Sequence, residues 1–343
     1  MDRRRFLQAS GLLGANLFLA RGSQAATEPP VPFQGGAVVS PNMNHVPSFV
    51  GVEKGIFLRH GLDLKLKVIP SGQAMNKALH AGEVQFASAA ISNFPMAVER
   101  GLPAIGVEGV LGDATDPYYD ENLAVVVRGD SGIRELKELV GKRIGTLVGG
   151  TGDQYLRTLF RRRGLPADHL VFLHVSLPNQ LATLQAGGVE AICTWEPYVT
   201  MILGKLPGAR LLFRGGGNFG YFIFSQAARE LAERSPAVVE RYVRGLAEAS
   251  QYTRQHLDEA ADISTRWISG LDPQIARKAI RFLAYDPRIS PHSLQALDES
   301  VRALVEQRKL KAPVPRERLV DTRFIEKVLR EHPALFSDLK PLR

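Results

Sequence analysis

Hydroxyl, amide and glycine residues gather in four short turns that each follow an apolar segment of the chain. These turns are residues 41–45, 71–73, 88–92 and 149–154. Such residues hold small oxyanions by hydrogen bonds, since the free N–H groups at a helix start carry partial positive charge. The same residue types also cap helices without touching a ligand, so each turn has a binding and a capping interpretation.

The glycine-rich turn at residues 149–154 does not favour a nucleotide. It lacks the Gly-Lys-Ser/Thr ending of a phosphate loop, and its spacing differs from the dinucleotide fingerprint. The nearest basic residue after the turn is Arg157, within the next helical turn, whereas the phosphates of a nucleotide usually require a nearby Lys or Arg. The sequence therefore favours a small anion at this turn.

The sequence gives little support for a catalytic nucleophile or for a metal site. Cys193 is the only cysteine and lies within the apolar segment 191–195, which predicts a buried structural thiol and not a nucleophile. The eight histidines are dispersed, and neither a His-x-x-x-His nor a Cys-x-x-Cys pair occurs. We therefore expect no enzyme activity, no metal site and no cofactor.

The elements that must position these turns are short strands alternating with helices. Such alternation of Val-, Ile- and Phe-rich segments with helical patterns is typical of parallel strands joined by crossover helices, and it predicts an α/β fold. From residue 227 onward apolar residues recur at helical spacing, which predicts a helical C-terminal region. Ligands of open α/β sheets bind beyond the carboxyl ends of strands, so all four turns could face one cleft. The predicted strands are residues 37–40, 62–69, 85–89, 104–110 and 123–128 in a first unit, and 143–148, 171–175, 191–195, 210–213 and 221–225 in a second.

The N-terminal segment, residues 1–25, predicts an export leader of the twin-arginine type. Three arginines at 3–5 precede an apolar run at 11–20, and small residues end the segment at Ala25. An apolar run of about ten residues is too short to span ~30 Å of hydrocarbon. Asp2 stands where this leader type usually has Ser or Thr, so secretion of the unfolded chain stays an alternative. Because no cysteine follows the leader, we expect a protein free in the periplasm.

Charge and composition are those of an ordinary globular chain of about two domains. The 343 residues carry a net charge of +8, which falls to +5 without the leader, because four arginines and one aspartate are lost. The basic residues are scattered without interleaved aromatic residues, so we expect no nucleic-acid partner.

Three sequence blocks resemble the substrate-binding components of nitrate, sulfonate and taurine uptake transporters, a family that also includes thiamine-precursor binding proteins. The first block is residues 45–63, with Lys-Gly-Ile-Phe followed by Gly-Leu-Asp. The second combines Ser71-Gly72 with residues 81–85. The third runs from Leu184 to Tyr198 and resembles a Gly-x-Val-Asp-Ala to Trp-x-Pro-Tyr signature, with Glu190 in place of Asp.

This resemblance implies a two-lobed type II periplasmic binding protein fold, in which two α/β lobes are joined by hinge crossings at residues 123–128 and 221–225. The expected domains are the leader 1–25, a first lobe of 26–124 plus 222–343, and a second lobe of 125–221. The implied ligand is a small anion or zwitterion. The implied partners are an ABC transporter permease and its ATPase, and we expect a monomer.

The resemblance also implies that the turns supply the ligand-binding groups. Trp195 would pack on the organic part of a ligand or in the core. Glu196 would hold an ammonium group such as that of taurine, or form a salt bridge or helix cap. The expected site residues are Asn44, His45, Ser71, Gly72, Ser88, Thr151, Gly152, Trp195 and Glu196.

The identity of the ligand stays open among several classes. A sulfonate or taurine is favoured over nitrate, because the turns contain no Arg or Lys. A pyrimidine precursor, or an aromatic carboxylate stacked on Trp195 or Phe94, is the alternative ligand. A sensor that serves a membrane kinase is an alternative role. A desulfinase of the same fold would need a nucleophilic cysteine near residues 42–45, where this chain has none.

Overall fold

The computed structural model describes residues 33–69 and 72–342. The predicted leader and Ser71 therefore lie outside the described residues. Each of the ten predicted strands overlaps one observed strand, and the prediction of an α/β chain with a helical C-terminal region is confirmed.

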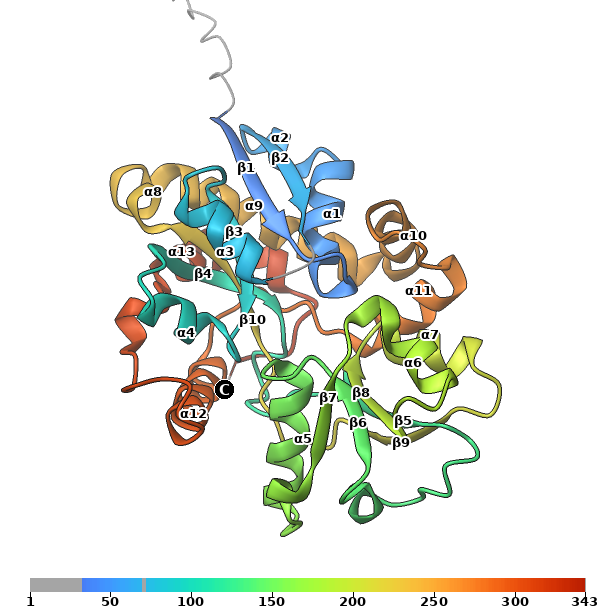
Figure 1. The fold of residues 1–343 in the computed structure, drawn as a ribbon. Coiled ribbons are helices and arrows are strands. Elements are labelled where there is room, and N and C mark those ends of the chain that lie inside the picture. The colour runs from blue at the N-terminus through green and yellow to red at the C-terminus, as the bar shows by residue number, and fades with distance from the viewer. Residues whose placement is uncertain (1–32, 70–71, 343) are drawn as a thin grey trace, which may run out of the picture. The chain divides into compact units, whose positions relative to one another are not determined.

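The first sheet has the strand order β2-β1-β3-β10-β4 (Figure 1). Strand β1 pairs in parallel with β2 and β3, whereas β10 runs antiparallel to both of its neighbours, β3 and β4. The strand bounds are β1 Phe33–Val39, β2 Leu62–Val68, β3 Phe86–Ala90, β4 Ala104–Leu111 and β10 Ile223–Ala228. The helices between them are η1 Met43–His45, α1 Val46–Glu53, α2 Ile56–Arg59, α3 Gly72–His80 and α4 Phe94–Glu99.

The second sheet repeats this arrangement with the order β7-β6-β8-β5-β9. Here β5 is the strand that runs antiparallel to both neighbours, β8 and β9. The strand bounds are β5 Leu123–Val127, β6 Arg143–Thr146, β7 Val171–His174, β8 Ala191–Trp195 and β9 Arg210–Arg214. The helices are η2 Leu136–Leu139, α5 Thr151–Arg162, η3 Ala167–His169, η4 Leu177–Asn179, α6 Gln180–Gln185 and α7 Tyr198–Lys205.

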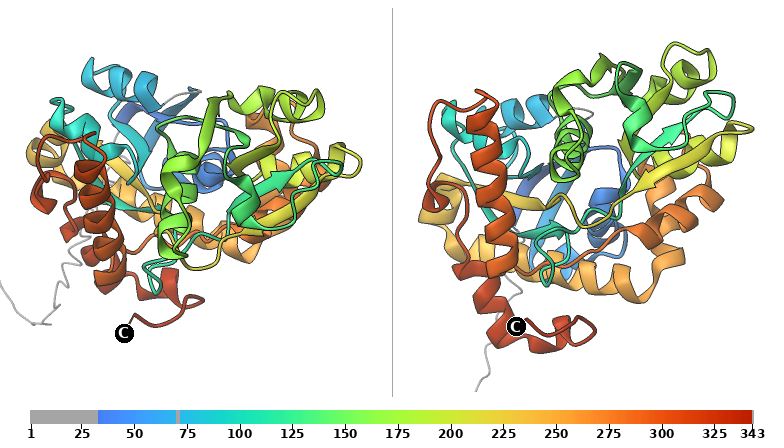
Figure 2. Two further views of the ribbon diagram at one scale, coloured as in Figure 1. Left: turned by 60° about the horizontal axis from the view of Figure 1, so that its bottom comes forward. Right: turned by 90° about the horizontal axis from the view of Figure 1, so that it is seen from below.

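After β10 the chain is helical (Figure 2). These elements are α8 Arg229–Arg234, α9 Pro236–Gln255, α10 Leu257–Trp267, α11 Pro273–Ala279, η5 Ile280–Phe282, α12 Pro291–Glu306, η6 Arg316–Arg318, α13 Arg323–Glu331 and η7 Pro333–Phe336.

Helix α9 is the long helix that covers the first sheet. Proline at its first position suits a helix start, and its residues Val239, Tyr242, Val243 and Leu246 are buried at helical spacing. The Tyr242 ring stacks on Phe86 of β3 with centroids 3.7 Å apart. Helix α9 also packs against α1 and α13, whereas α11 reaches α7 of the second half.

Two segments connect the sheets, residues 112–122 from β4 to β5 and residues 215–222 from β9 to β10. The predicted crossings, 123–128 and 221–225, largely coincide with β5 and β10, and the lobe bounds derived from them stay a prediction. The apolar Leu-Ala-Val-Val-Val run of β5 is buried throughout, and such a run is more stable inside a sheet than in a connection. The polar and glycine-rich residues just before each strand make the connections.

The two connecting segments are bonded to each other. The buried carboxylate of Asp120 accepts hydrogen bonds from the backbone N–H groups of Gly217, Asn218 and Phe219 at 3.0, 2.9 and 3.1 Å. The N–H of Tyr221 donates to the carbonyl of Tyr119 at 3.0 Å. These bonds fix the position of Tyr221, whose side chain takes part in the site described next.

Candidate functional site

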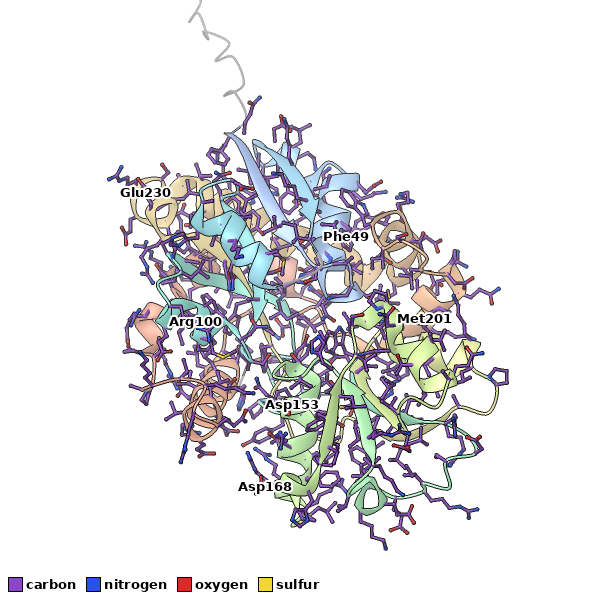
Figure 3. The ribbon with its side chains drawn as sticks, in the orientation of Figure 1. Phe49, Arg100, Asp153, Asp168, Met201 and Glu230 are labelled. Atoms are coloured by element: carbon purple, nitrogen blue, oxygen red, sulfur yellow. The ribbon has the colours of Figure 1, made fainter. Side chains whose placement is uncertain are left out.

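The site is built where strands β1, β3 and β6 end and helical turns begin. After β1, the side chain of Asn42 accepts a bond from the N–H of Asn44 and so starts η1. After β6, Gly150 is extended and precedes α5, and Asp153 accepts the N–H of Gly149 at 2.8 Å. Asp153, labelled in Figure 3, lies in the first turn of α5. Capping therefore accounts for part of the polar composition of these turns.

His45 and Ser88 form one buried pair. The His45 Nδ1 atom and the Ser88 Oγ atom are 3.1 Å apart, and both side chains are almost fully buried. Burial lowers the pKa of His45 to about 3, because an apolar environment disfavours the imidazolium. The imidazole is therefore neutral near pH 7, and it can offer a ligand a neutral hydrogen bond but no charge.

A second group of buried polar side chains joins the two halves of the chain. The Asn44 Nδ2 atom donates to the hydroxyl of Tyr221 at 3.0 Å. The hydroxyls of Ser92 and Thr151 are 3.0 Å apart, and the Gln154 Nε2 atom donates to the carbonyl of Ser92 at 2.9 Å. We call these five residues, Asn44, Ser92, Thr151, Gln154 and Tyr221, the bridging cluster.

Tyr221 is the central residue of the bridging cluster. Burial raises the pKa of its hydroxyl, and hydrogen bonds with the side chains of Thr151 and Asn44 oppose that rise. Its hydroxyl thus lies between η1, which follows a strand of the first sheet, and α5, which follows a strand of the second. All five side chains of the bridging cluster are neutral, so a ligand there would be held by hydrogen bonds alone.

Several buried polar atoms of the described residues have no hydrogen-bond partner, and two of them belong to expected site residues. They are Oδ1 of Asn44, an acceptor, and Nε1 of Trp195, a donor. Trp195 is the last residue of β8 and is only 7% exposed. Buried polar groups of native proteins are nearly always paired, so both atoms are candidates for contact with a ligand or with water.

Gly152 has a packing role. A Cβ atom there would lie 2.4 Å from the Thr146 Oγ1 atom and 2.8 Å from the carbonyl oxygen of Cys193. The Cys193 thiol donates to the carbonyl of Gly152 at 3.2 Å, and burial raises the pKa of that thiol. The glycine thus lets the start of α5 lie directly on β8, and the thiol is kept protonated and enclosed.

Glu196 is fully buried and already paired. Its Oε1 atom lies 2.6 Å from the Nη2 atom of Arg214, and its Oε2 atom accepts the N–H of Thr200 at 3.0 Å. Burial raises the pKa of Glu196, and the Arg214 guanidinium opposes that rise. Arg214 in turn lies over the ring of Phe282, 3.8 Å from its centroid. The salt-bridge and helix-cap interpretation of Glu196 therefore describes its contacts, with both carboxylate oxygens in use.

The structure therefore brings some of the expected site residues together and separates others. Asn44 and Thr151 meet through Tyr221, and His45 meets Ser88, whereas Glu196 is bonded to Arg214. Gly72 is the first residue of α3, and Ser71 lies outside the described residues. Their roles in ligand binding stay predictions.

Ser92, Gln154 and Tyr221, which the structure places in the bridging cluster, were not among the expected site residues. Ser92 and Gln154 end two of the turns singled out from the sequence, so their position was a usable signal. Tyr221 carried no such signal, because its partner Asn44 lies 177 residues earlier in the chain.

Within residues 33–69 and 72–342, no group of three or more His, Cys, Asp or Glu side chains is arranged to hold a metal ion. In the same part of the chain, no helix combines the length and apolarity needed to cross a membrane.

The architecture defines the class of protein. The two mixed sheets have matching strand orders, and in each the antiparallel strand directly follows a connecting segment. This is the two-lobed type II periplasmic binding protein fold. The fold class predicted from the sequence is confirmed. Residues 42–260 match the protein family described as NMT1/THI5 like, and the chain belongs to that family.

Two curated relatives illustrate the similarity. A Brucella abortus protein named as a binding protein is 24% identical over 222 residues, which cover 64% of this chain and 66% of that relative. The match thus spans just under two thirds of the relative's length. A Bacillus subtilis protein named for binding aliphatic sulfonates is 25% identical over 293 residues, which cover 83% of this chain and 86% of that protein.

Solved structures agree with this fold. The periplasmic aliphatic sulphonate binding protein SsuA from Escherichia coli superposes with a TM-score of 0.73 at 18% identity, over 85% of this chain and 92% of that one. The desulfurization enzyme DszB has a TM-score of 0.63 at 16% identity, over 87% of this chain and 99% of that one. The fold thus occurs in binding proteins and in an enzyme, and the residues of the site must decide between them.

Proposed function

We propose that this chain is an extracytoplasmic solute-binding protein that captures a small organic anion and delivers it to the permease of an ABC transporter. A sulfonate or a taurine-like zwitterion is the ligand class that we favour. The names of the sulfonate-binding relatives support this class, and the predicted leader and the name of the E. coli structure support a periplasmic location.

The observation that carries the proposal is the bridging cluster. Its hydroxyl and amide groups come from a helical turn of each half of the chain and from one connecting segment. A ligand that replaces hydrogen bonds between the halves would hold them together, which is how a hinged binding protein closes around its substrate. We propose that the halves move about the connecting segments 112–122 and 215–222.

Neutral polar groups suit a singly charged oxyanion. A sulfonate has three acceptor oxygens and one negative charge, and hydrogen bonds to charged groups are stronger than those between neutral groups. Thr151 begins α5, where N–H groups and the helix dipole favour negative charge. Ser88, His45 and the cluster hydroxyls add neutral donors.

A taurine-like ligand would also need a partner for its ammonium group. The free Oδ1 atom of Asn44 is one acceptor for it. Glu196 would serve only if it left Arg214. We therefore propose that the site binds the sulfonate group. Whether it also binds an ammonium group is tested by the Glu196→Gln variant described in the Discussion.

The second candidate ligand is a pyrimidine precursor or another flat heteroaromatic ring. The free indole N–H of Trp195 and the free amide oxygen of Asn44 favour it, because an aminopyrimidine has both ring acceptors and an amino donor. A ligand-sensing role beside a membrane kinase would use the same site and differs only in the partner protein.

We propose that the chain is not an enzyme. The only thiol, Cys193, is buried, its pKa is raised by burial, and it is bonded to a backbone carbonyl. A nucleophile needs the thiolate and access to its substrate.

A thermal-shift screen tests the proposal. The purified protein is heated with taurine, alkanesulfonates, nitrate, hydroxymethylpyrimidine or aromatic carboxylates. A ligand present at about 100 times its dissociation constant stabilises the native state by ~2.7 kcal/mol, which raises the melting temperature measurably. A shift with alkanesulfonates alone supports the sulfonate assignment, a shift with the pyrimidine alone selects the second candidate, and no shift with any of them contradicts both.

A further inference from the structure

A surface cavity lies where α4 ends and the chain leaves α12. Its volume is about 490 Å3, and it is lined by Glu99, Arg100, Arg308, Lys309, Leu310 and Lys311. We call it the basic cavity. Figure 1 shows α4 and α12 on the same side of the molecule, and a bond of 2.8 Å from the N–H of Lys311 to the Glu99 carboxylate holds the two segments together. Small-molecule sites typically have volumes of about 300–1,000 Å3.

Four cations meet one carboxylate in the basic cavity. None of Arg100, Arg308, Lys309 and Lys311 forms a side-chain ion pair with any residue in the described part of the chain. Glu99, the only acidic residue among the lining side chains, is bonded to a backbone N–H. Several other arginines of the C-terminal helices are paired, for example Arg316 with Asp298 and Arg323 with Asp321. The basic cavity thus gathers positive charge without an acidic partner among the described residues, with Arg100, Arg308 and Lys311 exposed to solvent.

The backbone at Arg308 is unusual. Among the described residues, Arg308 is the only non-glycine residue with a positive φ, at +57°. It follows the end of α12, where its N–H bonds to Val305 and the next N–H bonds to Leu304. Glycine normally occupies this left-handed position because it has no Cβ atom. A non-glycine residue in this backbone conformation is a candidate for a functional role. The side chain of Arg308 lines the basic cavity.

Lys309 is half-buried beside the start of α5. Burial lowers the pKa of its ammonium group, Asp153 opposes this effect, and Arg157 adds to it. Asp153 is itself paired with Arg157 at 2.6 Å, so it does not form a dedicated pair with the lysine. An anion in the cavity would give the Lys309 ammonium the close partner that it lacks.

We propose that the basic cavity is a binding site for a small multivalent oxyanion of the phosphate class. Several negative charges are needed to match four cations, and tetrahedral oxyanions offer acceptors to both arginine and lysine donors. A singly charged sulfonate would leave most of the positive charge unneutralised. No residue of the bridging cluster lines the basic cavity, so this inference is independent of the proposed transport ligand.

Isothermal titration of the full chain with inorganic phosphate and with pyrophosphate tests the inference. We expect pyrophosphate to bind more tightly than phosphate, nitrate to show no binding, and the affinity to fall as salt concentration rises. The informative variant is Arg308→Gly, because glycine suits the left-handed backbone. It should melt no lower than the native protein and should weaken pyrophosphate binding roughly tenfold or more.

Lys278→Gln is the matched control. Lys278 is an exposed lysine on α11 that forms no ion pair with another described residue and does not line the cavity. It should leave the affinity unchanged. Equal losses in Arg308→Gly and Lys278→Gln would mean that net charge alone attracts the anion, and this result would overturn the site. So would the absence of pyrophosphate binding, or unchanged binding in Arg308→Gly.

Discussion

The amide of Asn44 donates to the hydroxyl of Tyr221 across 3.0 Å, although 177 residues separate them in the chain. Asn44 belongs to the turn after the first strand, and Tyr221 lies at the end of the second connecting segment. Both side chains are buried. The bond therefore ties a turn of the candidate site directly to the segment 215–222, about which we propose that the halves move.

Tyr221→Phe should destabilise the fold, because it leaves the buried Asn44 amide without its acceptor. The expected loss is about 1–3 kcal/mol in the free energy of unfolding, the usual cost of an unpaired buried polar group. Urea denaturation measures it. Tyr198→Phe is the control, since no hydrogen bond of the Tyr198 hydroxyl is found among the described residues. Equal losses in the two variants would contradict the role of the Tyr221 hydroxyl.

Thr151→Pro should weaken ligand binding while the fold persists. Proline is tolerated at the first position of a helix, and Thr151 is the first residue of α5, but proline lacks the N–H donor. A lost hydrogen bond to a charged ligand costs at least ~1.5 kcal/mol of affinity. Thr151→Val is the companion variant, since it keeps the N–H and removes only the hydroxyl, which is bonded to Ser92 and Tyr221. If binding to the ligand found in the thermal-shift screen survives in Thr151→Pro, the helix start is not part of the site.

Glu196→Ala should destabilise the protein more than the double variant Glu196→Ala/Arg214→Met. The carboxylate is fully buried and the Arg214 side chain is 11% exposed. Removing one partner of a buried ion pair costs about 3–5 kcal/mol, because the other charge stays without a counter-ion, whereas replacing both partners with apolar residues is often nearly neutral. Denaturation of the native, single and double variants measures the difference. A double variant no more stable than Glu196→Ala would show that the Arg214 charge is solvated well enough without its partner.

Glu196→Gln separates a structural role from an ammonium contact. Both carboxylate oxygens are already bonded within the protein, so we expect equal losses of affinity for taurine and for an alkanesulfonate of similar size. Titration calorimetry with the two ligands decides the matter. A loss confined to taurine would show that Glu196 contacts the ammonium group.

Asp120 should make a contribution to the free energy of unfolding that decreases as pH rises from about 4 to about 6. Burial raises the pKa of Asp120 to about 6, although the N–H groups of residues 217–219 oppose the rise. The folded state then holds a proton that the unfolded state, with an ordinary aspartate pKa near 4, has already lost. This component is fully present below pH 4, is lost through pH 6, and amounts to at most about 3 kcal/mol.

Comparison with Asp120→Asn isolates this component, because His45 acts in the opposite direction. Burial holds the pKa of His45 near 3, so the unfolded state binds its proton first and stability falls as pH decreases below about 6.5. The unfolding free energy of the native protein minus that of Asp120→Asn should decrease as pH rises from 4 to 7. A difference that is constant over this range would mean that the pKa of Asp120 is not raised by folding.

The strands could be predicted from the sequence because their signal is local. Leu123–Val127 and Ala191–Trp195 are two buried, largely apolar segments. A strand that is buried on both faces of its sheet reads as such a continuous apolar segment, so it can be recognised without knowing its neighbours. The placement of β5 and β10 antiparallel inside the sheets is not a local property, and it was not predicted: the family resemblance implied only that these segments are crossings between the lobes.

The site was predicted less completely because its contacts join distant parts of the chain. Glu196 could be singled out as a carboxylate at a strand end, but its partner Arg214 lies 18 residues further on and carries no motif. Gly152 stood in a glycine-rich turn, yet its close approach to Thr146 and Cys193 depends on how α5 lies on β8. Residue types predicted where polar groups gather, and only the three-dimensional arrangement shows which of them are already bonded.

The position of β10 between β3 and β4 has a consequence for biosynthesis. A ribosome that has made residues 33–111 has produced four strands of the first sheet, but β3 and β4 have no strand between them until residues 223–228 emerge. Until then both strands present unpaired edges, and such edges favour intermolecular pairing. The second sheet, whose five strands are contiguous from residue 123 to residue 214, can be completed first. Truncation between these points would thus leave a nascent chain with a finished second half and an open, aggregation-prone first half.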